Sequence, residues 1–383
     1  MTHVLVIGAG PAGTRCAEAC AEQGLRVTLV GAEPGLPYDR VALGKVLGGA
    51  EPSVLAMPDP ARLGIHHLPA TRVTRLDRLA RRAMTADGQA IAYDHAVLAT
   101  GSDAWRLPLP GAEHALMYRT LEDVAAMRAA AIPGEPAVVI GGGLLGLEAA
   151  AGLADLGCDV TVLHAMPWLM ERQLDAPAAA TLRRHLEARR LRFVMPAATA
   201  AIEPGAVVLK DGTRIPARLT VLAVGVRPNI ALAEGLVTKR AIVVDDHLRT
   251  SDTHVFAIGE CAEHRGQVCG LVAPALAMAE AAAATIAGRP TRYQVPTLSA
   301  TLKIAGLPVW SLGEIAPEGA EPISIDDAAF GEYRGFWLRE GRLVGAVLCG
   351  DAADSGFYQG FLGAEVGDRA AFALGPAFFK AAA

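Results

Sequence analysis

Two glycine-rich segments carry the residue types that bind the pyrophosphate of a dinucleotide. Both have the spacing GxGxxG, and their glycines are Gly8, Gly10, Gly13 and Gly141, Gly143, Gly146. In this motif the first glycine makes a tight turn, the second lets the backbone approach the pyrophosphate, and the third lets a helix pack closely on a strand. Unpaired N–H groups at the start of the helix then face the phosphates. Pro11 and Ala12, inside the first motif, are expected to line the same site.

The same elements surround both motifs. Residues 4–33 and 137–166 each predict an apolar strand, a glycine turn, an alanine-rich helix and a second apolar strand. In both copies the glycine expected to end the helix, Gly24 or Gly157, follows the last motif glycine by eleven residues. A single GxGxxG is weak evidence, but two copies in complete βαβ units predict two dinucleotide sites, one for a flavin and one for a nicotinamide.

The residue that usually binds the ribose is an acid at the end of the second strand. That position is Gly31 in the first copy, where Glu33 follows two residues later, and His164 in the second copy, which supplies no acid there. The choice between NADH and NADPH is therefore open. Because no arginine follows within the next few residues to hold a 2′-phosphate, we expect NADH, with NADPH the less favoured nucleotide.

Further strands end at glycines that could line the sites. They are the strand ending at Thr100 and Gly101, the strand ending at Gly225, and the strand running into Gly259. Residues 71–99 predict short strands with a hairpin turn at Asp87. Prolines near 110 and 228 suggest that one domain is inserted in another. We therefore predict a flavin domain over 1–110 and 228–295, a nicotinamide domain over 111–227, and an α+β domain over 296–383.

These motifs together resemble the pyridine-nucleotide-dependent FAD oxidoreductase superfamily. The short motifs that carry the resemblance are GAGPAG, ATGS, GGGLLGLE and AIGEC. Longer stretches, LPYDRVALGK, VTVLHAMPWLMERQLD, AIGECAEHRGQVCGLVAP and LREGRLVGAVLCGD, are similar to the flavin module of assimilatory NAD(P)H nitrite reductase and to the NADH-diaphorase subunit of assimilatory nitrate reductase. The resemblance implies an α/β fold: two Rossmann-like domains, for FAD and NAD(P), with a smaller α+β C-terminal domain. His164 looks like the usual residue of that subfamily.

The resemblance also implies three residues close to the chemistry. Lys45 and Lys303 fall where related reductases place a lysine against the flavin, and an ammonium there would favour negative charge on the reduced ring. The alternative is that both are ordinary surface lysines. Glu148, directly after the second motif, would reach the nicotinamide or flavin region. The alternative for Glu148 is an acid in the first turn of the helix that complements the helix dipole. Lys45 and Glu148 are the predicted catalytic residues.

Four more contacts to FAD are implied by the resemblance. Glu260 replaces the more usual aspartate and would accept a hydrogen bond from the ribityl chain, beside Gly259. Val272 would contact the flavin ring and Val73 the adenine, although both are also ordinary apolar core positions. For Arg40, a flavin contact and a structural ion pair are both open.

Cysteine usage argues against thiol and metal chemistry. Residues 38–47, YDRVALGKVL, contain no cysteine where disulfide reductases of this superfamily carry their redox pair. Disulfide exchange and single-cysteine peroxide chemistry are therefore disfavoured. The six cysteines include no CxxC and no metal-site spacing, so we predict no metal.

Composition restricts the partners and the compartment. With 35 basic and 40 acidic residues the formal charge is −5, which lacks the basic surplus that nucleic acid needs. Residues 270–288 are the nearest to a membrane span, but they contain Pro274 and Glu280, so we predict a buried amphipathic helix and no membrane association. The N-terminal sequence does not resemble a signal peptide, and free thiols are expected, so we expect a cytoplasmic protein.

These observations lead to one main functional prediction and two alternatives. The chain carries none of the iron–sulfur or sirohaem ligands of complete nitrite reductases, so we expect a freestanding diaphorase that passes electrons from NADH through FAD to a separate redox protein, an assimilatory nitrate or nitrite reductase. The first alternative is a rubredoxin or ferredoxin reductase for an oxygenase. The second is a flavin-binding, redox-sensing interaction protein without turnover.

Overall fold

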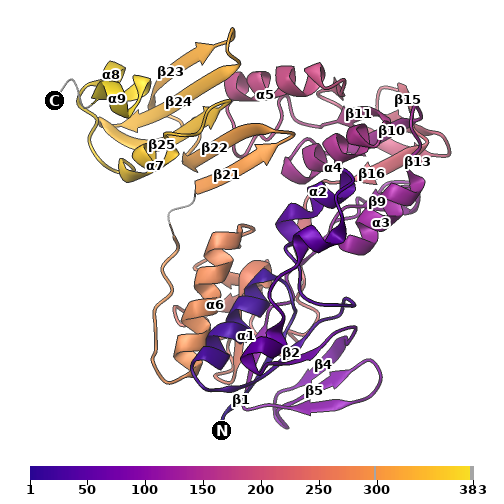
Figure 1. Cartoon of the computed structure of the whole chain (residues 1–383), viewed down its shortest axis with the longest axis vertical. Coiled ribbons are helices and arrows are strands. Elements are labelled where there is room, and N and C mark those ends of the chain that lie inside the picture. Colours follow the sequence, from indigo (N-terminus) through magenta and orange to yellow (C-terminus); the bar gives the residue numbers. More distant parts are fainter. Residues whose placement is uncertain (297–298, 380–383) are drawn as a thin grey trace. The chain divides into compact units, whose positions relative to one another are not determined.

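The computed structural model describes residues 1–296 and 299–379, apart from the side chains of residues 300–304 (Figure 1). The chain divides into two compact units. The first contains Met1–Leu43, Glu51–Asp103 and Val226–Pro296, and the second contains Gly44–Ala50, Ala104–Gly225 and the described part of the C-terminal segment. The three domains expected from the sequence stay a prediction, because this division yields two units and places Gly44–Ala50 in the second.

The first unit is built on a five-stranded parallel sheet. Its central strand is buried from Val4 to Ile7, as expected for a continuous apolar run in a parallel sheet with both faces covered. In order across the sheet, the strands are β19 (Val255–Ala257), β7 (His95–Leu98), β1 (His3–Ile7), β2 (Arg26–Val30) and β3 (His66–Leu68).

Two helices of the first unit pack side by side (Figure 1). They are α1 (Pro11–Glu22) and α6 (Val272–Ile286), and Arg15 of α1 pairs with Glu280 of α6 at 2.5 Å. Helix α6 lies within residues 270–288, and eight of its fifteen residues, including four of its eight alanines, are buried, so the prediction of a buried helix there is confirmed. Among the described residues, no helix is both long enough and apolar enough to cross a membrane.

Smaller sheets complete the first unit. The expected hairpin is confirmed: Gly88, with φ +85°, lies between the second and third strands of an antiparallel sheet. That sheet consists of β4 (Val73–Asp77), β5 (Arg82–Thr85) and β6 (Ala90–Ala92). Two further pairs are β8 (Ser102–Ala104) with β17 (Val226–Pro228) and β18 (Ile242–Val244) with β20 (Ala262–His264).

The second unit repeats the parallel arrangement. Its strands, in order across the sheet, are β12 (Arg192–Val194), β11 (Asp159–Leu163), β10 (Pro136–Ile140), β16 (Leu219–Leu222) and β9 (Leu116–Met117). The helices of this part are α2 (Leu43–Leu47), α3 (Leu121–Ala130), α4 (Leu144–Asp155) and α5 (Ala176–Ala188). A three-stranded antiparallel sheet is formed by β13 (Thr199–Glu203), β14 (Ala206–Leu209) and β15 (Arg214–Pro216).

An antiparallel sheet and short helices form the C-terminal part. Across the sheet the strands are β21 (Ser299–Ile304), β22 (Leu307–Gly313), β25 (Arg342–Cys349), β24 (Glu332–Arg339) and β23 (Glu321–Asp327). The helices are α7 (Ser355–Gly360), α8 (Arg369–Leu374) and α9 (Pro376–Phe379). Aromatic side chains join the two: Phe336 of β24 lies 4.6 Å from Tyr358 and 5.2 Å from Phe372, ring centre to ring centre.

Candidate functional site: two equivalent glycine turns

The first glycine of each motif makes the same turn in both units. Gly8 has φ +116° and Gly141 has φ +125°, a region that L side chains avoid. The N–H of Gly8 donates to Val30 O and that of Gly141 to Leu163 O, both at 2.8 Å. A Cβ on either glycine would lie 2.2 Å from a backbone carbonyl oxygen of the neighbouring strand end, so only glycine fits.

The second and third glycines differ in what surrounds them. A Cβ on Gly13 or Gly146 would lie 1.8 or 1.9 Å from the carbonyl oxygen of the first motif glycine, which explains why the helix can pack so closely there. By contrast, apart from the glycine itself and its chain neighbours, no atom of the described residues lies within 4 Å of the place where a Cβ on Gly10 or Gly143 would stand.

The middle glycines also begin the two helices. Gly10 is the N-cap of α1 and Gly143 the N-cap of α4, and neither helix start has a side-chain cap. A helix of twelve residues with an uncapped start and open backbone beside it fits the pyrophosphate of a dinucleotide. The residues of both turns therefore fit the cofactors that the sequence implies.

Three strand ends of the first unit meet at the first turn. Gly8 abuts Ala99, and a Cβ on Gly259 would lie 3.3 Å from the Cβ of Ala12. The turn, the segment of Thr100 and Gly101, and the segment of Gly259 and Glu260 are thus brought together at the carboxyl ends of β1, β7 and β19. This is the edge at which open parallel sheets bind ligands.

Polar side chains near this turn have protein partners. The Thr100 hydroxyl donates to Asn229 O at 2.7 Å, and the Ser102 hydroxyl donates to the Glu260 carboxylate at 2.8 Å. Residues Gly101, Gly225 and Gly259 all have positive φ. Val73 begins β4 and packs against the core, whereas Val272 begins α6 and is 37% exposed. Their contacts to a flavin stay predictions.

Glu33 is held by two side chains that follow it. It accepts hydrogen bonds from the Tyr38 hydroxyl at 2.6 Å and from the Arg40 guanidinium at 2.5 Å. Arg40 also lies over the Tyr38 ring, 5.0 Å from its centre. The ion pair that the sequence left open for Arg40 is therefore present, and its contact to a flavin stays a prediction.

Glu148 lies in a closely packed part of the second unit. It is the fifth residue of α4, beyond the first turn that the dipole alternative requires. A Cβ on Gly44 would lie 3.7 Å from the Cβ of Glu148 and 3.4 Å from the Tyr118 hydroxyl. Burial raises the pKa of Glu148 to about 7. The pKa of Tyr118 is also raised, by burial and then by the charge of Glu148, and its hydroxyl has no hydrogen-bond partner in the described structure.

Of the two lysines predicted to contact the flavin, only Lys45 has a side chain among the described residues. Lys45 is exposed on α2 beside Gly44, and within residues 1–296 and 299–379 it makes no ion pair. The side chain of Lys303 lies outside the described residues. The flavin contacts of both lysines stay predictions.

His164 lies beside the second turn, with a neighbour that the sequence analysis missed. Its Nδ1 accepts a hydrogen bond from the Gly142 N–H at 3.0 Å, and its Nε2 lies 3.1 Å from Glu171 Oε2. Neither Glu171 nor Tyr118 was predicted from the sequence as a residue of the site. Tyr118 comes close to Glu148 only through the packing of separate segments, and Glu171 reaches His164 only because Met170 reverses the chain.

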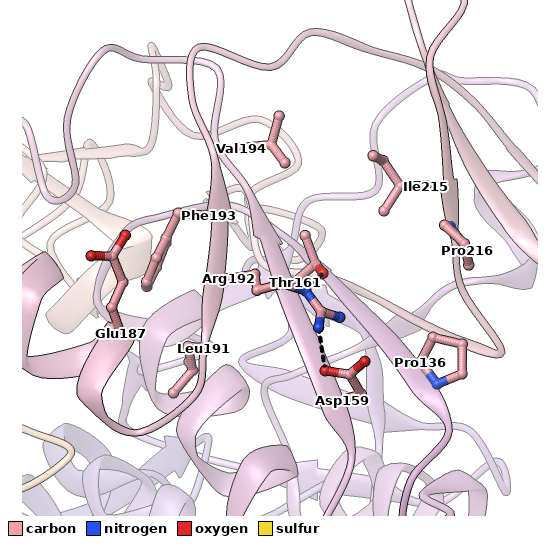
Figure 2. A pocket seen from close by; sticks show the side chains of 10 residues that line it. All are labelled: Pro136, Asp159, Thr161, Glu187, Leu191, Arg192, Phe193, Val194, Ile215 and Pro216. Carbon is pink, nitrogen blue, oxygen red and sulfur yellow. Dashed lines mark hydrogen bonds and ion pairs between the residues drawn. The ribbon is translucent and has the colours of Figure 1, made fainter.

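A separate hollow lies in the second unit, at the amino ends of the strands of its parallel sheet, whereas the glycine turn lies at their carboxyl ends. Figure 2 shows its lining, in which Arg192 and Asp159 form an ion pair at 2.6 Å. It has a volume of about 770 Å³ and is lined by the first residues of β10, β11 and β12, namely Pro136, Asp159 and Arg192. Because cofactors of open parallel sheets bind at the carboxyl ends of strands, we assign no cofactor to this hollow.

Parallel sheets with two equivalent glycine turns define a protein that binds two dinucleotides. Sequence comparison specifies the family: residues 2–285 match the pyridine nucleotide-disulphide oxidoreductase family, and the chain belongs to it. Residues 299–363 match the rubredoxin NAD+ reductase C-terminal domain. The predicted superfamily, fold class and enzyme class, an oxidoreductase using FAD and a pyridine nucleotide, are confirmed.

Named relatives extend this result. The chain is 39% identical to a nitrite reductase [NAD(P)H] of Bacillus subtilis over 369 residues, covering 92% of this chain and 46% of that protein. It is 38% identical to the assimilatory nitrate reductase electron transfer subunit of the same organism, covering 92% of this chain and 48% of that protein. The chain thus spans about half the length of these relatives. A crystal structure of a ferredoxin reductase from Rhodopseudomonas palustris superposes with a TM-score of 0.90 at 29% identity, covering all of both chains.

Proposed function

We propose that this chain is an FAD-dependent NADH oxidoreductase that passes electrons to a separate redox protein, an assimilatory nitrate or nitrite reductase. The observation that carries the reaction class is the pair of equivalent glycine turns, each open at its middle glycine. The proposed acceptor rests on the likeness to the nitrite reductase and to the nitrate reductase electron transfer subunit. We place this reaction in the cytoplasm.

The residues of the chain bind and orient in this proposal. The uncapped start of α1 binds the FAD pyrophosphate and that of α4 the NADH pyrophosphate, because both present free N–H groups and the positive end of a helix dipole. Glu33 binds the ribose of FAD. Glu260, whose carboxylate is oriented by Ser102, accepts from the ribityl chain. FAD, when bound, supplies the two-electron chemistry that joins NADH to the acceptor.

Glu148 and Lys45 act on the protons and charges near the flavin ring in this proposal. With a pKa of about 7, Glu148 can hold a proton at neutral pH and take part in proton exchange near the rings. Lys45 stabilises negative charge on the reduced ring. No thiol takes part, since residues 38–47 lack cysteine and burial raises the pKa values of Cys261 and Cys269.

A second acceptor class has its own observation. The C-terminal segment matches the rubredoxin NAD+ reductase C-terminal domain, and the ferredoxin reductase structure covers the whole chain. A rubredoxin or ferredoxin is therefore the alternative acceptor. A redox-sensing protein without turnover is the remaining alternative.

Anaerobic stopped-flow absorbance tests the proposal. The FAD-loaded protein is mixed with NADH, and the reduced protein is then mixed with a nitrate or nitrite reductase, a rubredoxin or a ferredoxin. We expect rapid bleaching by NADH and fastest reoxidation by the nitrate or nitrite reductase. Fastest reoxidation by a rubredoxin or ferredoxin would select the alternative, and bleaching too slow for turnover would favour the sensor.

A further inference from the structure

The ring of His164 is fixed in one orientation and one tautomer. His164 follows β11 directly, where the ribose-binding acid usually stands. Its Nδ1 accepts from the Gly142 N–H at 3.0 Å, so the proton of the neutral ring is on Nε2. That Nε2–H points to Glu171 Oε2 at 3.1 Å and donates to it. His164 therefore links a carboxylate to the glycine turn through two hydrogen bonds.

The segment that carries Glu171 is anchored to the same turn. Met170 N donates to Gly142 O at 3.0 Å, and Met170 adopts φ +53°, which reverses the chain. Leu169 and Met170 are both 1% exposed. A Cβ on Gly142 would lie 2.7 Å from His164 Cγ and 2.8 Å from Leu169 Cδ2, so ring, loop and turn fit together without spare space. The position of Glu171 is thus set by buried neighbours rather than by its own side chain.

The pair keeps a net negative charge. A neutral imidazole donor orients the carboxylate without neutralising it, and a carboxylate has about four lone-pair sites, of which His164 uses one. The Glu171 side chain is 27% exposed and the His164 side chain 10%, so the carboxylate can reach a ligand while the ring stays covered. A carboxylate in this place can accept from the two hydroxyls of a ribose and repels a 2′-phosphate.

We propose that Glu171, positioned by His164, is the acid that selects NADH against NADPH at the second glycine turn. The inference rests on the proposed function, since it assigns the nicotinamide nucleotide to this turn. It places the missing acid seven residues beyond His164 in the sequence. His164 is a positioning residue in this arrangement, and Glu171 touches the nucleotide.

Nucleotide binding without turnover tests the proposal. Titration calorimetry measures the dissociation constants of ADP-ribose and 2′-phospho-ADP-ribose for the oxidised, FAD-loaded protein and for Glu171→Gln and Glu171→Lys. Glu171→Gln keeps the shape and an acceptor for His164 but removes the charge. Exposed Glu135 of the same unit supplies the matched control, Glu135→Gln. FAD content and the thermal midpoint of each variant report folding.

We expect the wild type to prefer ADP-ribose, and this preference to fall about tenfold in Glu171→Gln, further in Glu171→Lys, and not at all in Glu135→Gln. An unchanged preference in folded Glu171→Gln overturns the proposal. Exposed Arg172, the next residue along the chain, is the nearest basic side chain in the sequence. A wild type that prefers the 2′-phosphate and loses that preference in Arg172→Ala also overturns the proposal. If the predicted preference is present but NADH fails to bleach the flavin, the proposed function is wrong and the role of Glu171 in nucleotide choice stands.

Discussion

Glu148 offers the sharpest test of the electrostatics of the second unit. Burial raises its pKa from the usual 4.5 to about 7. Between these two values the folded protein binds one proton that the unfolded chain does not, so the free energy of unfolding falls as the pH rises. At 1.36 kcal/mol for each pH unit, the loss is about 3 kcal/mol at pH 8 and less than about 1 kcal/mol at pH 5.

Glu148→Gln removes this loss because the amide carries no charge at any of these pH values. We therefore expect the variant to be more stable than the wild type by about 3 kcal/mol at pH 8 and by less than about 1 kcal/mol at pH 5. Urea unfolding of both FAD-loaded proteins at pH 5, 6, 7 and 8 measures the difference. The exposed control Glu135→Gln should change stability by less than about 0.5 kcal/mol throughout.

The same variant connects stability to the reaction. If Glu148 exchanges a proton near the reacting rings, the rate of flavin reduction by NADH should follow an ionisation near pH 7 in the wild type and not in Glu148→Gln. A stability difference that stays constant from pH 5 to 8 would refute the burial argument itself. A pH-dependent stability difference with an unchanged rate profile would leave Glu148 buried and titrating, but outside the chemistry.

Three other predictions concern the cofactor sites. Lys45→Ala removes a charge-assisted contact worth about 1.5–3 kcal/mol, so it should lower the two-electron midpoint potential of the flavin by roughly 30–60 mV. Spectroelectrochemistry at confirmed FAD occupancy measures this potential. An unchanged midpoint potential would show that Lys45 does not contact the flavin. FAD should be bound without a covalent link, so heat denaturation should release it into the supernatant, and a yellow precipitate would contradict this. Gly142→Ala places a Cβ 2.7 Å from the His164 ring, so it should lower the free energy of unfolding by about 1–3 kcal/mol. It should also weaken ADP-ribose binding while FAD stays bound. Full ADP-ribose affinity would show that this turn is not the nicotinamide site.

Local sequence predicts those parts of the fold that short segments determine. Each βαβ unit spans about thirty residues and contains its own motif glycines, helix-ending glycine and apolar strands. The two glycine turns therefore have the same hydrogen-bond length and similar φ angles, because each turn is determined by its own unit. The contact of Gly44 with Glu148 joins segments about a hundred residues apart, and no pattern in either segment announces it. Glu171 is close in sequence to His164, but its return depends on a positive φ at Met170, a conformation that methionine does not signal.

Glu33 and Glu171, the acids that we assign to the two nucleotides, have different partners. In the first unit Glu33 is paired with the Arg40 guanidinium, which offsets its charge, whereas in the second Glu171 is paired with a neutral imidazole N–H and keeps its charge. FAD has no 2′-phosphorylated counterpart to reject, so an acceptor for ribose hydroxyls is sufficient at the first turn. A site that must separate NADH from NADPH needs repulsion as well as hydrogen bonding, since specificity is a difference between two affinities. A histidine donor provides the geometry without cancelling that repulsion, and an arginine in its place would cancel it. Replacing the usual single acid with the His164–Glu171 pair is therefore consistent with selection of the unphosphorylated nucleotide.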